Sequence, residues 1–133
     1  MGYRQEVRGK RKYTMGKEGF KGLEVWQKAK ELAVRIYKIS DKGSLGKDFG
    51  LRDQMRKCAV SIPSNLAEGD ERDTDKESIR FFYIAKGSLA ELRTQLQIAL
   101  EVGYIGKDLF DTLDNDCVEI GKMLGALIKA RRP

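Results

Sequence analysis

The chain has 133 residues, 41% of them hydrophobic and 35% charged, with 26 Lys and Arg against 20 Asp and Glu. This length suits one domain with one core, and the net charge of +6 favours a polyanionic partner without requiring one. The chain has no histidine, which excludes Ser-His-Asp and Cys-His catalysis and the common zinc sites. It also has no glycine-rich phosphate loop for a nucleotide cofactor. We therefore expect no enzyme, cofactor or metal.

Residues 1–21 are expected to form a basic arm, ahead of a single domain at 22–133. The arm carries seven Lys and Arg against two Glu, and its scattered glycines and lack of an apolar period argue against a helix. It is either a nucleic-acid contact or a segment that docks on a neighbouring subunit. A third interpretation is an upstream extension, with Met15 as the natural start. The arm residues assigned to nucleic acid are Arg8, Lys10, Arg11 and Lys12.

Two amphipathic segments open the domain, and each is expected to be a helix because its apolar residues recur at three- and four-residue steps. The first runs from about 22 to 40 and ends in a glycine-rich loop at 41–46. The second runs from about 47 to 68 and contains Pro63, which removes a backbone hydrogen bond and predicts a kink. Gly69 then fits the left-handed position that follows many helices.

Two further helices are expected at about 74–102 and 107–130. The third begins with a capping box, Thr74 to Glu77, and its small pair Gly87-Ser88 favours close approach of a neighbouring helix. All connections are short. The fold prediction is therefore all-α: an antiparallel up-down-up-down four-helix bundle with a kinked second helix.

The third helix has more apolar surface than a closed bundle needs, because residues 81–85 read FFYIA. Surplus apolar surface on a small protein indicates an interface, so we expect a homo-oligomer. Trp26 of the first helix is expected to anchor the core or a subunit interface, with base stacking as the alternative. The predicted interface residues are Trp26, Phe81, Tyr83 and Ile84.

Basic residues recur around the second helix and the turn after it. Arg52/Arg56 and Lys76/Arg80 are i, i+4 pairs, so each pair lies on one helical face, where it can follow phosphates without reading sequence. In the alternative interpretation, interleaved Asp and Glu residues neutralise this charge locally. The predicted nucleic-acid contacts in the bundle are Arg52, Arg56, Lys57, Arg72, Lys76 and Arg80.

Several polar and sulfur-containing residues have helical spacing. The polar residues are expected to form a buried network that fixes helix register, with a substrate contact as the alternative. Cys58 and Cys117 occupy apolar positions and are expected to be buried free thiols. No apolar run is long enough to span a membrane, and a cytoplasmic location follows by default. The predicted network is Gln27, Asn65, Glu68, Arg72 and Glu91.

Three blocks in order carry a family resemblance, namely LEVWQKA, SIPSNLAEG and FFYIAKGSLAEL. The chain from about Leu23 to Tyr104 resembles the 23S rRNA intervening-sequence proteins, a four-helix-bundle family related to the accessory variability proteins of diversity-generating retroelements. The resemblance implies a bacterial all-α protein that assembles as a pentameric ring, has no known catalysis and binds nucleic acid. The competing hypothesis is a scaffold that docks onto a nucleic-acid enzyme such as a reverse transcriptase.

Overall fold

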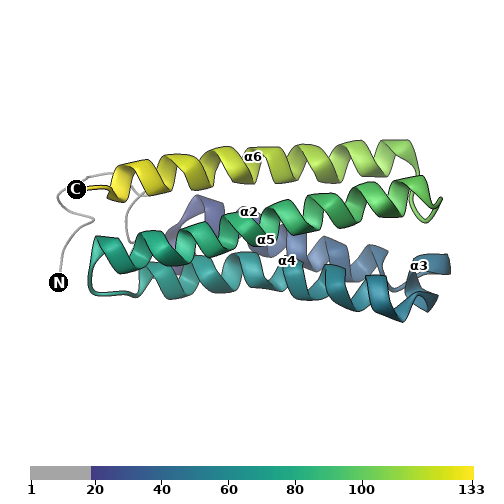
Figure 1. Ribbon diagram of the computed structural model, residues 1–133, viewed down its shortest axis with the longest axis horizontal. Helices are drawn as coiled ribbons and strands as arrows, with labels where there is room; N and C mark the ends of the chain where they lie inside the picture. The colour runs from purple at the N-terminus through teal and green to yellow at the C-terminus, as the bar shows by residue number, and fades with distance from the viewer. Residues whose placement is uncertain (1–18) are drawn as a thin grey trace.

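The computed structural model describes residues 19–133, which form five α-helices and one short 3-10 helix, with no β-strand in that range. Figure 1 shows the four long helices lying side by side along the long axis, with the short α3 at one end. The all-α prediction is confirmed, and no helix in this range is long and apolar enough to cross a membrane. The elements are η1 (Phe20–Gly22), α2 (Glu24–Ile39), α3 (Gly43–Lys47), α4 (Phe49–Asp70), α5 (Asp75–Glu101) and α6 (Lys107–Arg131).

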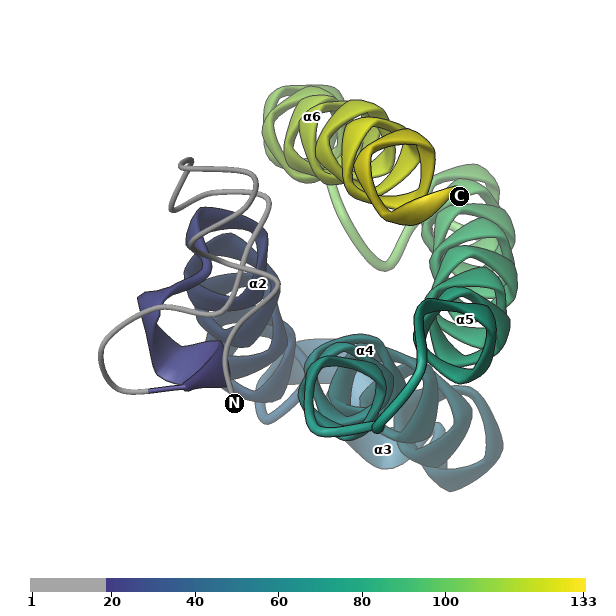
Figure 2. The same ribbon diagram turned by 90° about the vertical axis from the view of Figure 1, so that its left-hand side faces the viewer.

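The long helices α2, α4, α5 and α6 surround one interior in that order, as the end-on view shows (Figure 2). Each contributes a stripe of side chains that are at most 1% exposed, including Ile36, Met55, Phe82 and Leu124. The two cysteines belong to this core as free thiols, as predicted. Burial raises the pKa of Cys117 to about 12, so its thiol stays protonated at neutral pH.

The predicted loop at 41–46 is wrong in part, because it contains the one-turn helix α3. Gly43 has a φ of 61°, a conformation that residues with a Cβ rarely adopt, and it lets the chain turn sharply after α2. Leu45 is only 1% exposed and anchors the turn in the core. The glycines correctly marked a turn, but burial of Leu45 makes it an ordered one.

Gly69 is not the left-handed residue after a helix, because α4 continues through it to Asp70. A Cβ atom at position 69 would lie 2.6 Å from Cε1 of Phe82 and 3.0 Å from the Ser78 carbonyl oxygen. The glycine is therefore required by the close approach of α5. The pair Gly87-Ser88 behaves differently: Ser88 faces α4, whereas Gly87 points into open space.

Two side-chain caps define where α5 and α4 begin. The Thr74 side chain accepts a hydrogen bond from the Glu77 amide at 3.2 Å, which is the first of the two hydrogen bonds of the predicted capping box. At the start of α4, Asp48 accepts from the Leu51 amide at 3.1 Å and from the Tyr104 hydroxyl at 2.9 Å. These hydrogen bonds, the amide first, lower the pKa of Asp48. The second one ties the α5–α6 turn to the beginning of α4.

Candidate nucleic-acid interface

The described residues carry twenty Lys and Arg and eighteen Asp and Glu, so the location of each charge matters more than the total. The predicted pair Arg52 and Arg56 lies on one face of α4, but both side chains are engaged within the chain. Arg52 donates to the Gly46 carbonyl at 3.1 Å and covers the Phe49 ring at 4.6 Å. Arg56 donates to the Ser40 hydroxyl at 2.8 Å. Both residues hold the α2–α3–α4 corner together.

Lys57 is exposed but lies apart from that corner. It lines a polar cavity of about 410 Å³ between α4 and α5, together with Asp53 and Glu91. Two carboxylates beside one ammonium group give this cavity no excess positive charge. A phosphate would therefore gain little there.

Arg72, Lys76 and Arg80 lie at the α4–α5 turn, in a stretch where residues 68–80 hold six Asp and Glu against three Lys and Arg. The Arg72 guanidinium is 3.1 Å from Glu68, and the Arg72 and Arg80 groups lie 4.5 and 5.5 Å from the centre of the Phe81 ring. The excess of carboxylates disfavours a phosphate at this turn. The alternative interpretation, in which interleaved Asp and Glu residues neutralise the basic charge locally, describes this end of the molecule better.

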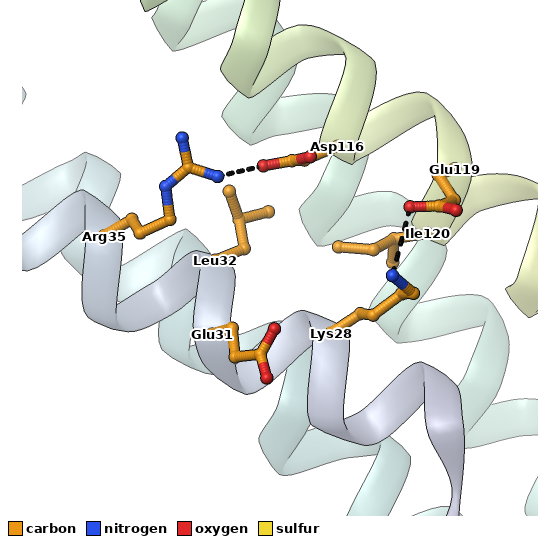
Figure 3. A pocket seen from close by; sticks show the side chains of 7 residues that line it. All are labelled: Lys28, Glu31, Leu32, Arg35, Asp116, Glu119 and Ile120. Carbon is orange, nitrogen blue, oxygen red and sulfur yellow. Dashed lines mark hydrogen bonds and ion pairs between the residues drawn. The ribbon is translucent and has the colours of Figure 1, made fainter.

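The seam between α2 and α6 is closed by paired charges (Figure 3). Arg35 pairs with Asp116, and Lys28 lies 3.4 Å from Glu119, above a small cavity of about 110 Å³. The side chain of Leu32 lies beneath the ion pairs. The two cations of the seam are already paired with carboxylates of the facing helix. We therefore interpret the seam as a link between α2 and α6 and not as a contact for phosphate.

A groove on the opposite side of α6 is different. We call it the α5–α6 groove, with a volume of about 300 Å³, and it is lined by Lys86, Leu89, Ala90, Arg93, Cys117, Val118, Gly121 and Lys122. Its floor is apolar and small, and its rim is basic. Arg93 is paired with Asp114 at 2.9 Å, but no ion pair to Lys86 or Lys122 is found among residues 19–133.

The basic rim continues along α6. Lys129 and Arg132 follow Lys122 after seven and ten residues, which places all three on one helical face. No Asp or Glu occurs after Glu119. This segregation also suits the helix dipole, which favours cations near the C-terminus. The prediction from sequence missed this face, although the seven-residue spacing of its cations on both helices indicated it.

The predicted polar network is not assembled as one unit. Gln27 is exposed and donates to the Lys21 carbonyl, Glu68 is paired with Arg72 on the surface, and Glu91 is exposed. Asn65 joins an interhelical network: it donates to the carbonyl and the hydroxyl of Ser61, whose hydroxyl lies 2.8 Å from that of Ser88 on α5.

A buried ion pair, which the sequence reasoning missed, joins the C-terminal ends of α4 and α6. The Nη2 atom of Arg131 donates to Oδ1 of Asp70 at 2.7 Å, and both side chains are 0% exposed. Their sequence separation of 61 residues gave no local indication of the pairing. Among residues 19–133, no group of three or more Cys, Asp or Glu side chains is arranged to hold a metal ion.

The four predicted interface residues occupy different environments. Trp26 is half-buried and packs edge-on against Phe20, with ring centres 5.1 Å apart. Phe81 is 9% exposed, whereas Tyr83 and Ile84 are 45% and 46% exposed. Of the four residues, only Tyr83 and Ile84 are exposed.

A second apolar surface lies between α2 and α4. We call it the α2–α4 groove, with a volume of about 440 Å³, and it is lined by Lys30, Ala33, Val34, Tyr37, Lys38, Val60 and Pro63. Val34, Tyr37 and Val60 in this groove are each at least 40% exposed.

Comparison with known proteins agrees with this architecture. A family model described as 23S rRNA-intervening sequence protein matches residues 21–126. A crystal structure of a protein of unknown function from the S23 ribosomal protein family of Bacteroides thetaiotaomicron is similar, with a TM-score of 0.73 and 29% identity, over 79% of this chain and 98% of that chain. The comparison with curated proteins gave no match. The chain therefore belongs to the 23S rRNA-intervening sequence protein family.

Proposed function

We propose that this protein is a non-enzymatic, oligomeric four-helix bundle that binds RNA or DNA through the phosphate backbone, with the α5–α6 groove as the contact site. One observation carries the proposal: five cations follow the basic face along α5 and α6, and among the described residues only one of them, Arg93, has an ion-pair partner, Asp114. The cations are Lys86, Arg93, Lys122, Lys129 and Arg132.

The spacing of these cations suits a charged chain that lies along the groove. Lys86 and Arg93 are seven residues apart on α5, as are Lys122 and Lys129 on α6, which corresponds to about 10 Å along each helix axis. Contacts of this kind bind phosphate oxygens and do not discriminate between bases. Binding is therefore expected to be largely independent of sequence and to weaken with salt.

The proposal includes an antiparallel up-down-up-down topology. The contacts between adjacent helices support this topology, because residues later on one helix contact residues earlier on the next. On α4 and α5, Cys58 contacts Gln95 and Ser61 contacts Ser88. On α2 and α6, Lys28 and Arg35 pair with Glu119 and Asp116. A kink at Pro63 remains part of the proposal, because the proline leaves the carbonyl four residues earlier without its usual donor.

Self-association is supported by two separate apolar surfaces. The α2–α4 groove lies on one side, and Ile84 and Ile98, each 46% exposed, lie on the outer face of α5. Two different surfaces on one chain allow a head-to-tail contact, and such a contact can close into a ring. A ring, which the family resemblance implies to be pentameric, would repeat the basic face and raise the avidity for a long polyanion.

Charge reversal in the groove tests the proposed contact site. Lys86→Glu with Lys122→Glu is expected to weaken binding to generic RNA and DNA by about tenfold or more at 50 mM salt, because two phosphate contacts become repulsive. The slope of log affinity against log salt should become shallower by about 1.4 for a single strand, since each phosphate that is no longer neutralised reduces it by about 0.7. Fluorescence anisotropy at several salt concentrations measures both quantities.

Lys42→Glu with Lys47→Glu is the matched control, since both lysines are exposed at the distant α3 end and the net charge changes equally. The control should bind within about twofold of the unmodified chain. Equal losses in the two variants would mean that only the net charge matters. Unchanged binding in the groove variant would remove the α5–α6 groove from the proposal.

Self-association has its own test. Light scattering on the purified chain is expected to give a multiple of the 15.1 kDa chain mass. Val34→Lys should lower that mass by placing a charge in the α2–α4 groove, whereas Val118→Lys, in the α5–α6 groove and away from both apolar surfaces, should not. A monomeric mass for the unmodified chain at high concentration would rule out the oligomer.

The second candidate function is a scaffold that docks onto a protein acting on nucleic acid, such as a reverse transcriptase. The α2–α4 groove favours it, because apolar surface flanked by Lys30 and Lys38 suits a protein partner. The two functions separate at low salt. A folded chain that fails to bind RNA and DNA at 50 mM salt would favour the scaffold.

A further inference from the structure

We propose that the α5–α6 groove takes a single strand of RNA or DNA in preference to a duplex, with Tyr83 as the platform on which one base stacks. This inference rests on the proposed function, because it uses the same basic face. It adds the form of the nucleic acid and a residue that contacts a base.

Tyr83 lies in line with the groove. Tyr83, Lys86, Ala90 and Arg93 follow at steps of three, four and three residues, so they share one face of α5. The Tyr83 hydroxyl accepts a hydrogen bond of 2.8 Å from Nη2 of Arg132, at the end of the cation row on α6. This bond links Tyr83 to the residue that follows α6, so Tyr83 lies between the two helices, about one turn of α5 before the groove residue Lys86. Ile84, the next residue, points about 100° away around the helix and does not share this face.

Tyr83 also differs from the other exposed aromatic residues. Three aromatic side chains in residues 19–133 are exposed, namely Tyr37, Phe49 and Tyr83. Arg56 covers the Tyr37 ring at 4.7 Å and Arg52 covers the Phe49 ring at 4.6 Å. No cation or second ring lies over Tyr83 in the described structure. Its 45% exposure therefore leaves ring surface open for a base.

The groove and the platform together fit one strand. From Tyr83 to Arg93 the α5 face extends about 15 Å, since ten residues rise about 1.5 Å each. This length spans a short stretch of one strand, on the order of a few nucleotides. Cations from α5 and α6 border the line on both sides, as expected for a single backbone running between two helices.

A duplex cannot use the platform without opening. Its bases stack on one another and pair inward, whereas the bases of a single strand can leave the stack and lie on an aromatic ring. Stacking tolerates every base, because each has a π-face, so it preserves the sequence independence of the backbone contacts. Preference for single strands is thus expected from Tyr83 and not from the cations.

The experiment compares labelled U20 and dT20 with a 20-base-pair duplex by fluorescence anisotropy, using the full chain. Tyr83→Leu is expected to weaken single-strand binding by about 5- to 150-fold, which corresponds to the usual loss of one base–aromatic stack. Duplex binding should change by less than about twofold. Tyr83→Phe keeps the ring and loses only the bond to Arg132, so it should retain single-strand binding within about threefold.

Phe49→Leu is the matched control, because Phe49 is an exposed aromatic residue at the start of α4 that lines neither the α5–α6 groove nor the α2–α4 groove, and it should not affect binding. Single strands that carry 4-thiouridine should crosslink to the peptide that contains Tyr83. Light scattering should give the same mass for Tyr83→Leu as for the unmodified chain.

Three results would overturn the inference. These are equal affinity of the unmodified chain for single strands and duplex, equal weakening of both by Tyr83→Leu, or a lower oligomer mass for Tyr83→Leu, which would assign the ring to a subunit interface. Each of them leaves the effect of Lys86→Glu with Lys122→Glu intact. If the proposed function is wrong, Lys86→Glu with Lys122→Glu will leave binding to every nucleic acid unchanged.

Discussion

Arg131→Met is expected to lower the free energy of unfolding by about 3–5 kcal/mol, the usual cost of breaking a buried ion pair from one side. The Arg131 guanidinium and the Asp70 carboxylate are both fully buried and 2.7 Å apart, and Arg131 also lies 5.4 Å from the centre of the Phe82 ring. Removing the cation leaves the carboxylate in an apolar environment without the charge that compensates its desolvation. Urea unfolding followed by circular dichroism, at one fixed chain concentration, measures the loss.

Two further variants make this prediction specific. Arg131→Met combined with Asp70→Leu should cost less than Arg131→Met alone, because no buried charge is left uncompensated. Arg93→Met removes one partner of the exposed Arg93–Asp114 pair and should cost about 1 kcal/mol or less. If Arg131→Met cost no more than Arg93→Met, the buried pair would not be a main contributor to stability.

Gly69→Ala is expected to destabilise the bundle by about 1–3 kcal/mol, although alanine ordinarily favours a helix over glycine by about 1 kcal/mol. The added Cβ would lie within 3.0 Å of the Phe82 ring and the Ser78 carbonyl oxygen. Phe82 is 0% exposed and packed in the core, so relieving the contact requires a shift of its ring or a separation of α4 and α5. The effect should appear as a lower urea midpoint.

Gly87→Ala, in the neighbouring helix α5, is expected to change the free energy of unfolding in the opposite direction. Gly87 lies inside α5, and a Cβ there meets no atom within 4 Å. This substitution should raise the free energy of unfolding by up to about 1 kcal/mol through helix propensity alone. Stabilisation by both substitutions would show that α4 and α5 do not pack closely at position 69.

The helices follow from local patterns in the sequence. Apolar residues such as Leu89, Leu92 and Leu96 recur at helical spacing and are all buried, and the Thr74 cap begins α5 where a capping box predicts it. Gly69 shows the limit of such patterns. A glycine near a predicted helix end resembles a left-handed terminator, and only the position of Phe82 reveals that it is needed for packing.

The candidate site was predicted less well, for a related reason. Arg52 and Lys86 are both basic residues on amphipathic helices, and a sequence pattern treats them alike. The structure distinguishes them, because Arg52 donates to a carbonyl of its own chain while Lys86 borders an open groove. Which charges are compensated depends on contacts between residues distant in sequence, such as Arg93 with Asp114.

The sequence by itself determined that the chain is all-α, where its long helices lie and that it has an excess of positive charge, because helix periodicity, caps and composition are local properties. Tertiary structure alone decided that Arg131 is buried against Asp70, that Gly69 accommodates Phe82, and that basic side chains of α5 and α6 border one groove. The physical reason is that burial and ion pairing depend on which helix faces meet. The facing residues come from segments tens of positions apart.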